Sequence, residues 1–293
     1  MKQIFIFVCC FTLFTGTAHA EVADKQPSTL SPQPSALSPQ PSTLSTQHPA
    51  LSTQPSTLSP QPSALSTQHS ALNPQHSALS TQNIQDAAFK GNAQAQNDLG
   101  GLFEKGIGQR KDFVEAVKWY RLAAEQGLAT AQYNLGVSYE QGQGVKRDYT
   151  EAVKWYRLAA LGGDAFAQCN LGTMYTNGQG VSVNHAEALK WFRLAADQHD
   201  AEAQFNLGVI YENAQGVNQD YATALKWYRL SAARGNPAAQ CNLGWMYENG
   251  RGVTLDYAEA IKWYQRSAAQ GDTHALYNLG SIHEKIGKRN IDK

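Results

Sequence analysis

The sequence has little of what enzymes, metal sites and charged binding surfaces need. Its 293 residues include four cysteines and three methionines, and 24 basic side chains balance 24 acidic ones. Balanced charge gives no long-range attraction to nucleic acid or to anionic lipid, so neither is an expected partner. Paired-cysteine metal motifs, a phosphate-binding glycine loop and a serine, histidine and acid at informative spacing are also missing. We therefore predict no catalytic residue, no cofactor and no metal site.

The chain also lacks an apolar run of membrane-spanning length. The stretch from Ile4 to Phe14 follows Lys2 and precedes small residues that end in Ala18-His19-Ala20. This layout is typical of a cleaved secretory signal, and the run is shorter than the roughly 20 residues of a spanning helix. We predict that residues 1–20 are removed and that the protein is periplasmic or secreted, with no membrane attachment afterwards. An uncleaved anchor is the alternative.

Proline is scarce everywhere except in one tract, because ten of the 11 prolines lie between Gln26 and Gln82. This tract repeats every seven residues, as in Gln26-Pro27-Ser28-Thr29-Leu30-Ser31-Pro32, and holds no charged residue. One leucine per heptad is too few for a coiled coil, and the small apolar area cannot offset the entropy of ordering. We predict a disordered linker over residues 21–83. One interpretation is a stalk between the signal and the folded domain whose Ser and Thr residues accept glycans. The other is a neutral tandem expansion.

The rest of the chain is organised by a period of 36 residues, the mark of a repeat solenoid. Five tryptophans recur at this spacing, and so do six Leu-Gly pairs from Leu99 to Leu279. The tryptophans are Trp119, Trp155, Trp191, Trp227 and Trp263. We predict a solenoid over residues 84–293, with five full units that begin at residues 92, 128, 164, 200 and 236, and a half unit from Asp272.

Each unit contains two helical patterns. Ala131, Leu135 and Tyr139 lie on one face of a first helix, and residues 149–161 show helical spacing for a second. Asp148 stands three residues before Glu151, which predicts a capping box in which the carboxylate reaches back to the cap. Glycines follow the second helices, because the residue after a helix often adopts a left-handed backbone conformation that glycine tolerates. These patterns predict an all-α fold of stacked antiparallel helix pairs.

The motifs then identify a family resemblance. Between Ala131 and Tyr156 the unit reads Ala-Gln-Tyr-Asn-Leu-Gly, Tyr-Glu, Gly-Gln-Gly-Val, Asp-Tyr and Glu-Ala-Val-Lys-Trp-Tyr. This pattern closely resembles the Sel-one-like repeat, a relative of the tetratricopeptide repeat, over residues 84–293. The resemblance implies a right-handed superhelix whose concave surface is lined mainly by first helices. It also implies an exported scaffold that binds an envelope or host protein or peptide, and we expect a monomer.

A cysteine-rich branch of this family implies an alternative function, hydrolysis of a β-lactam or of peptidoglycan. Its units are stapled by paired cysteines, whereas Cys169 and Cys241 occupy the same position in units two apart. Stacked helices place such positions about 20 Å apart, beyond the reach of a disulfide. The sequence therefore favours the scaffold.

Candidate binding residues are positions on the first helices that vary while their neighbours recur. They point away from the row of Ala131 and Leu135, and an aromatic strip rimmed by carboxylates suits a peptide or partner helix. The predicted residues are Tyr133, Val137, Phe205, Val209, Trp245, Tyr277, Glu140, Glu212 and Glu248. The alternative is that they pack between adjacent first helices. The tryptophans of the 36-residue series are predicted to be structural.

One region departs from the pattern. His199 replaces a closing glycine, Ala214 replaces a loop glycine, and Val183-Asn184-His185 replaces the usual entry to a second helix. We predict that residues 164–216, around the third unit, are the least stable part of the solenoid.

Overall fold

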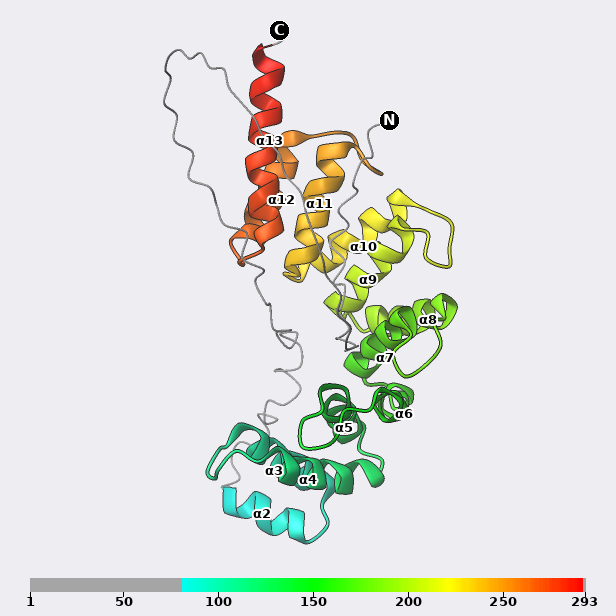
Figure 1. The fold of residues 1–293 in the computed structure, drawn as a ribbon, viewed down its shortest axis with the longest axis vertical. Helices are drawn as coiled ribbons and strands as arrows, with labels where there is room; N and C mark the ends of the chain where they lie inside the picture. The colour runs from blue at the N-terminus through cyan, green and yellow to red at the C-terminus, as the bar shows by residue number, and fades with distance from the viewer. Residues whose placement is uncertain (1–80, 292–293) are drawn as a thin grey trace, which may run out of the picture. The chain divides into compact units, whose positions relative to one another are not determined.

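The computed structural model describes residues 81–291, with side chains as far as residue 287. The predicted signal at residues 1–20 and the predicted linker as far as residue 80 lie outside this range. Residues 81–83, predicted as the end of the linker, instead form the start of α2. Twelve helices and no strand occur in the described part (Figure 1). The helices are α2 (Thr81–Phe89), α3 (Ala93–Lys105), α4 (Phe113–Glu125), α5 (Ala129–Gln141), α6 (Tyr149–Leu161), α7 (Ala165–Asn177), α8 (His185–Asp197), α9 (Ala201–Glu212), α10 (Tyr221–Ala233), α11 (Pro237–Asn249), α12 (Tyr257–Ala268) and α13 (Thr273–Ile291).

The helices follow one another as stacked pairs, which confirms the predicted solenoid. Each helix contacts the next in the chain, and the tightest contacts join the two helices of one unit. First helices are α3, α5, α7, α9, α11 and α13, and second helices are α4, α6, α8, α10 and α12. Figure 1 shows these pairs following one another from α2 to α13. None of the helices among residues 81–291 is long and apolar enough to span a membrane.

Polar caps begin the second helices, although the predicted capping box is only half formed. Asp148 accepts hydrogen bonds from the backbone N–H groups of Thr150 and Glu151 at 2.9 and 3.1 Å. Its own N–H donates to the Tyr139 carbonyl of the first helix at 3.0 Å. The prediction that Glu151 would take this donor is wrong, and Glu151 lies instead 2.5 Å from Lys154 Nζ. The tertiary hydrogen bond therefore ties the two helices of a unit together.

Backbone conformation explains the glycine pattern at the ends of second helices. Gly163 and Gly235 have φ of 89° and 91°, a left-handed conformation that costs a residue with a Cβ about 1–2 kcal/mol. His199 holds the equivalent position with φ 69°, and Ala214 has φ 57° in a loop. These are the only non-glycine residues with positive φ in the described chain. Both residues with this backbone strain lie within residues 164–216, the region predicted to be the least stable.

A glycine and an aromatic ring join the two helices of each unit. A Cβ added to Gly136 would lie 2.6 Å from the Tyr156 ring, and one added to Gly172 would lie 2.7 Å from Phe192. The same joint recurs at Gly100, Gly208 and Gly244. Leu135 and Tyr156 are fully buried beside it. The glycine of the Leu-Gly pair therefore recurs because the second helix packs so closely on the first that a Cβ would not fit there.

The 36-residue tryptophans connect neighbouring units. Trp155 packs on the cluster of Ala116, Tyr120 and Leu135, which belongs largely to the preceding unit. Trp227 and Trp263 pack in the same way on the clusters before them. First helices add a polar link, since Gln132 Nε2 donates to the Ala124 carbonyl at 3.1 Å. That bond adds a side-chain donor from the next unit to a carbonyl that already accepts the Gly127 N–H at 3.0 Å.

Candidate protein-binding surface

The predicted strip on the first helices is largely covered by neighbouring helices. Tyr133 is 3% exposed, with its ring 5.8 Å from Tyr156 and 6.1 Å from Phe166 of the next unit. Phe205 is 8% exposed and lies 5.8 Å from Tyr228. These positions therefore pack between helices, as in the alternative interpretation, and offer a partner little surface. The physical reason is that a second helix and the next first helix both cover this face.

The predicted carboxylates have a structural partner in their own unit. The Tyr156 hydroxyl donates to Glu140 Oε2 at 2.5 Å, and Tyr228 and Tyr264 donate to Glu212 and Glu248 at 2.5 and 2.6 Å. Burial raises the pKa of the Glu140 and Glu212 carboxyls, and the tyrosine hydrogen bond only partly opposes it. These glutamates therefore accept the hydroxyl of the same tyrosine whose ring packs on the glycine of the first helix.

Sequence reasoning did not find the pairing of these glutamates with tyrosines. The signal was present, because the third unit has Thr176 where the others have glutamate and Phe192 where the others have tyrosine. Both partners of the hydrogen bond are lost together. Thr176 instead donates to the Gly172 carbonyl at 3.0 Å within its own helix.

One position per first helix remains partly accessible and differs between units. Val137, Val209 and Trp245 are half-buried at equivalent positions, where the third and sixth first helices carry Thr173 and Ser281. Trp245 packs against two hydrophobic clusters at once, one on each side of its helix. Tyr277 on α13 is 77% exposed. The structure therefore divides the predicted set into buried residues, glutamates bonded to tyrosine, the half-buried members of the variable row, and the exposed Tyr277.

A row of asparagines beside the variable positions was missed, since the prediction looked only for residues that change. Asn170, Asn206, Asn242 and Asn278 recur at the 36-residue spacing and are half-buried. Asn134, one unit earlier, is buried and donates to Asn97 Oδ1 at 2.9 Å. Each asparagine lies one helical turn before a variable residue, so amide groups border this row.

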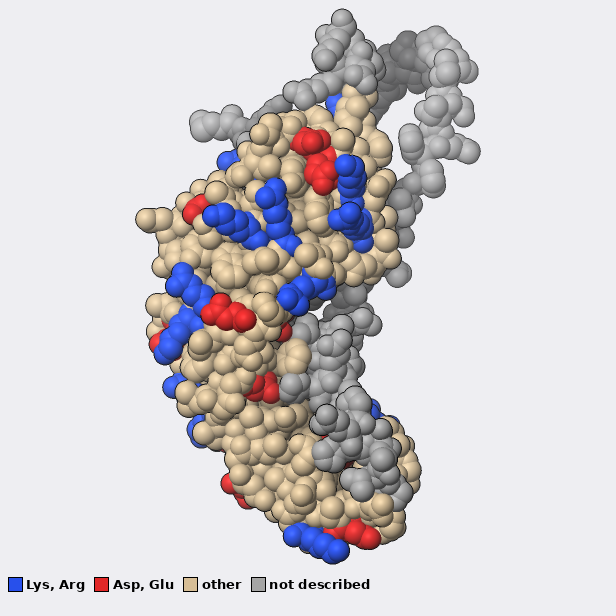
Figure 2. Space-filling view, turned by 180° about the vertical axis from the view of Figure 1, so that it is seen from behind, with Lys and Arg blue, Asp and Glu red and all other residues tan. Residues whose placement is uncertain are grey.

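Several arginines of the second helices connect neighbouring units, whereas the lysines in ion pairs are paired within their own helix. Arg157 donates to the Tyr175 hydroxyl of the next unit at 2.5 Å, and Arg121, Arg193 and Arg229 make the equivalent bond. Lys154 pairs with Glu151 in its own helix. Figure 2 shows Lys and Arg in separate groups with Asp and Glu among them on the face seen from behind. This distribution agrees with a structural role rather than with a continuous basic surface.

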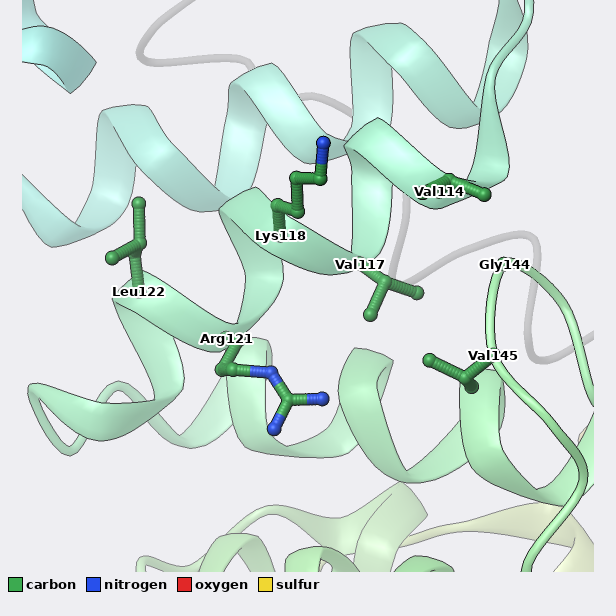
Figure 3. A pocket seen from close by; sticks show the side chains of 7 residues that line it. All are labelled: Val114, Val117, Lys118, Arg121, Leu122, Gly144 and Val145. Carbon is green, nitrogen blue, oxygen red and sulfur yellow. The ribbon is translucent and has the colours of Figure 1, made fainter.

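An open hollow lies where unit one meets the loop of unit two. It encloses about 430 Å³ between α4 and the loop after α5, and it is lined mainly by aliphatic side chains (Figure 3). Its two cations are already engaged, because Lys118 pairs with Glu115 and Arg121 donates to Tyr139. The hollow therefore offers apolar contact without a free polar group to fix a small ligand.

Chemistry-bearing side chains are sparse in the described chain. Cys169 and Cys241 are buried and not joined in a disulfide, and burial raises the pKa of the Cys169 thiol, which keeps it protonated. Within residues 81–291 no group of three or more His, Cys, Asp and Glu side chains has the geometry of a metal site.

Comparison with known proteins agrees with this architecture. The Sel1 repeat model matches residues 93–128, 129–164, 165–200, 201–236 and 237–272. A Sel1 repeat protein from Oxalobacter formigenes is 39% identical, with a TM-score of 0.66 over 69% of this chain and 82% of that one. The Escherichia coli protein c5321, described as a protective antigen of uropathogenic strains with an SLR fold, is 37% identical with a TM-score of 0.53.

The match to c5321 covers 71% of this chain and 52% of that one, so this chain spans about half of the antigen's length. No curated protein matches the sequence. Sel1 repeat proteins are typically scaffolds for protein interactions. Five consecutive matched repeats, with the helix pairs that they require, show that this chain belongs to the Sel1 repeat family.

Proposed function

We propose that this protein is a non-catalytic scaffold that binds another protein along the row formed by Val137, Thr173, Val209, Trp245 and Ser281. One observation carries the proposal. Most apolar positions that recur in every unit are buried by packing within and between units. This row differs from unit to unit and stays half-buried, although Val137, Val209 and Trp245 also contact the hydrophobic clusters. Side chains that change along a regular framework suit recognition rather than folding.

The chemistry of the row favours an extended peptide or a helix as the partner. Aliphatic and aromatic contacts at Val209 and Trp245 supply apolar area, and a partly buried tryptophan is a common anchor in interfaces. The asparagines one turn away add side-chain amides beside the row, although the Nδ2 atoms of Asn206 and Asn278 also donate to Cys169 and Cys241 Sγ. An amide has two N–H donors and an acceptor oxygen, which leaves capacity for a partner's backbone. A partner held in this way would touch several units, and its affinity would rise with the number of units engaged.

Site-specific photocrosslinking tests the proposal. A benzophenone amino acid is placed at Trp245 or Val209 in the native host, and at Leu158, which is 47% exposed on the second helix α6, as the matched control. We expect a discrete adduct from the first two positions and none from the third. Trp245→Ala should reduce the adduct formed at Val209. The same adducts from all three positions would contradict the proposed surface.

We also propose that the scaffold acts outside the cytoplasm, supported by the signal-like layout of residues 1–20. Fractionation with N-terminal sequencing tests this, and the expected mature protein begins at Glu21. The absence of catalysis is tested with the purified chain and a chromogenic β-lactam. Turnover that maps to a described residue would restore the hydrolase as a candidate.

A further inference from the structure

The last helix, α13, carries half of a helix-helix joint with no second helix on it among residues 81–291. Gly280 is equivalent to the five glycines that meet an aromatic ring, yet a Cβ added there would have nothing within 4 Å. At Gly244, in the unit before, the same addition would lie 2.5 Å from the Tyr264 ring. In Figure 1, α13 is the last helix of the row and extends beyond α12.

The polar part of the joint is also present on α13. Glu284 stands where Glu248 accepts the Tyr264 hydroxyl at 2.6 Å in the preceding unit. Glu248 is 6% exposed, whereas Glu284 is exposed. Gly280 and Glu284 are separated by one helical turn, so they lie on the same face. The face therefore has both the hollow for a ring and the acceptor for its hydroxyl.

Apolar side chains surround this half-joint. Tyr277 is 77% exposed and Leu276 is 56% exposed, although the equivalent residues Gln240 and Cys241 are 6% and 2% exposed. The opposite side of α13 is packed on the solenoid, since Ala275 and Ile282 are fully buried. Exposed large side chains next to an open helix joint mark an interaction surface.

The sequence also explains why α13 does not turn back to form a pair. Gly250 ends α11 with φ 63°, and the residue 36 positions later is Ile286. An isoleucine disfavours that left-handed conformation, so the helix continues to Ile291. Lys285 then reaches Glu248 at 2.6 Å and fixes α13 to the preceding unit. The open face is thus held on a rigid helix.

We propose that this face of α13, formed by Leu276, Tyr277, Gly280 and Glu284, binds an amphipathic helix of another protein that resembles a Sel1 second helix. The occupant is defined by the interfaces inside this chain, which are continuous with the open one. It carries a tyrosine whose ring rests on Gly280 and whose hydroxyl donates to Glu284. Small residues four before and three after that tyrosine let the helices approach, as Ala260 and Ser267 do around Tyr264.

A second copy of this chain fits less well. All five of its aromatic-bearing second helices already rest on their own glycines, at 2.4 to 2.7 Å from the position of an added Cβ. The helix α2 has Ile84 at the position of the tyrosine, and Ile84 is buried. A copy would have to give up one of its own pairs. This end surface meets the variable row of the proposed function only at Ser281 on α13. The crosslinking positions of the proposed function, Val209 and Trp245, lie on other helices, so either proposal can fail alone.

The test uses a helical peptide with the sequence of residues 256–271, which contains α12. A lactam between Lys262 and Arg266→Asp, both exposed positions in the chain, keeps it helical. The fluorescent peptide is titrated with the full chain and binding is read by anisotropy. We expect saturable binding, weakened tenfold or more by Gly280→Leu and by alanine at the peptide's tyrosine. Phenylalanine there, or Glu284→Gln in the protein, should weaken it less.

His274→Leu is the control, because His274 is exposed on the same helix but lies about 120° around the helix axis from Gly280, outside the proposed face. Replacing glycine in a helix favours folding, so loss of binding by Gly280→Leu would not reflect unfolding. Absence of peptide binding, or equal effects of the two leucine variants, would overturn the proposal. Sedimentation of the chain alone tests the second copy, and self-association removed by Gly280→Leu would replace the proposed occupant.

Discussion

The third and fifth units place the same two helices in contact with different chemistry. In the fifth, Tyr264 rests on Gly244 and donates to Glu248, which Lys285 also contacts. In the third, Phe192 rests on Gly172 and Thr176 replaces the glutamate. Both repeats keep an aromatic ring packed on a glycine, whereas the tyrosine hydroxyl and the glutamate are replaced together in the third. Shape complementarity therefore defines the joint, and the hydrogen bond only satisfies groups that a tyrosine brings with it.

The largest effect expected from this comparison is the loss of a ring. Tyr264→Ala and Phe192→Ala should each lower the free energy of unfolding by about 3–5 kcal/mol, because each leaves a cavity beside a glycine. The loss should be greater for Tyr264, since Glu248 also loses its hydroxyl donor. Urea unfolding followed by circular dichroism measures both. Losses under about 1 kcal/mol would show that the joint contributes little.

Exchanging the polar pair sharpens the comparison. In the third unit, Thr176→Glu and Phe192→Tyr should each destabilise the fold alone, since each leaves a poorly satisfied polar group. Together they should recover about 0.5–3 kcal/mol relative to the sum, the range for residues in direct contact. Four unfolding curves complete the double-mutant cycle. Strict additivity would mean that the third unit cannot form the hydrogen bond.

The helix ends offer a matched pair of smaller changes. His199→Gly should stabilise the protein by about 1 kcal/mol, and Gly235→His at the equivalent position should cost a similar amount, because both positions have positive φ. Amide exchange across residues 164–216 should slow in the first variant. Wild-type protection in that segment equal to that of residues 236–271 would contradict the predicted soft region.

A pH series gives the smallest expected difference. Burial holds the pKa of Glu140 above its usual value, so the folded chain binds a proton more readily than the unfolded chain. Its contribution is fully present below the unfolded pKa and is lost as pH rises through the raised folded pKa. Glu140→Gln should remove this component, so the stability of wild type relative to the variant should fall as pH rises. Unfolding curves at several pH values above 4 measure it.

Periodicity made most of the fold predictable. Trp155 and Gly136 recur in every unit, so the sequence predicts both the number of units and the paired helices. The hydrogen bond from Asp148 to Tyr139 was not predictable in this way, since it joins two helices whose approach the pattern of either helix alone does not define. Local capping rules favoured Glu151 as the partner and were wrong there.

The candidate surface was harder to predict for a geometric reason. The pattern of one helix indicates which residues lie on a different side from the row of Ala131 and Leu135. It correctly placed Tyr133 and Phe205 there. It does not show that two further helices cover the same face. Among the apolar and aromatic members of the set, only Val137, Val209, Trp245 and Tyr277 keep substantial exposed area, and the difference depends on neighbours 16 to 37 residues away.

The loop glycines have a further consequence. A Cβ at Gly144 would lie 2.0 Å from the Phe113 carbonyl oxygen, and one at Gly180 would lie 2.2 Å from that of Tyr149. At these points one unit touches the previous one through main-chain atoms, so part of the contact between neighbouring units does not depend on side-chain identity. During evolution, units of 36 residues can therefore be added, lost or changed in their exposed residues while this main-chain contact between neighbouring units is kept.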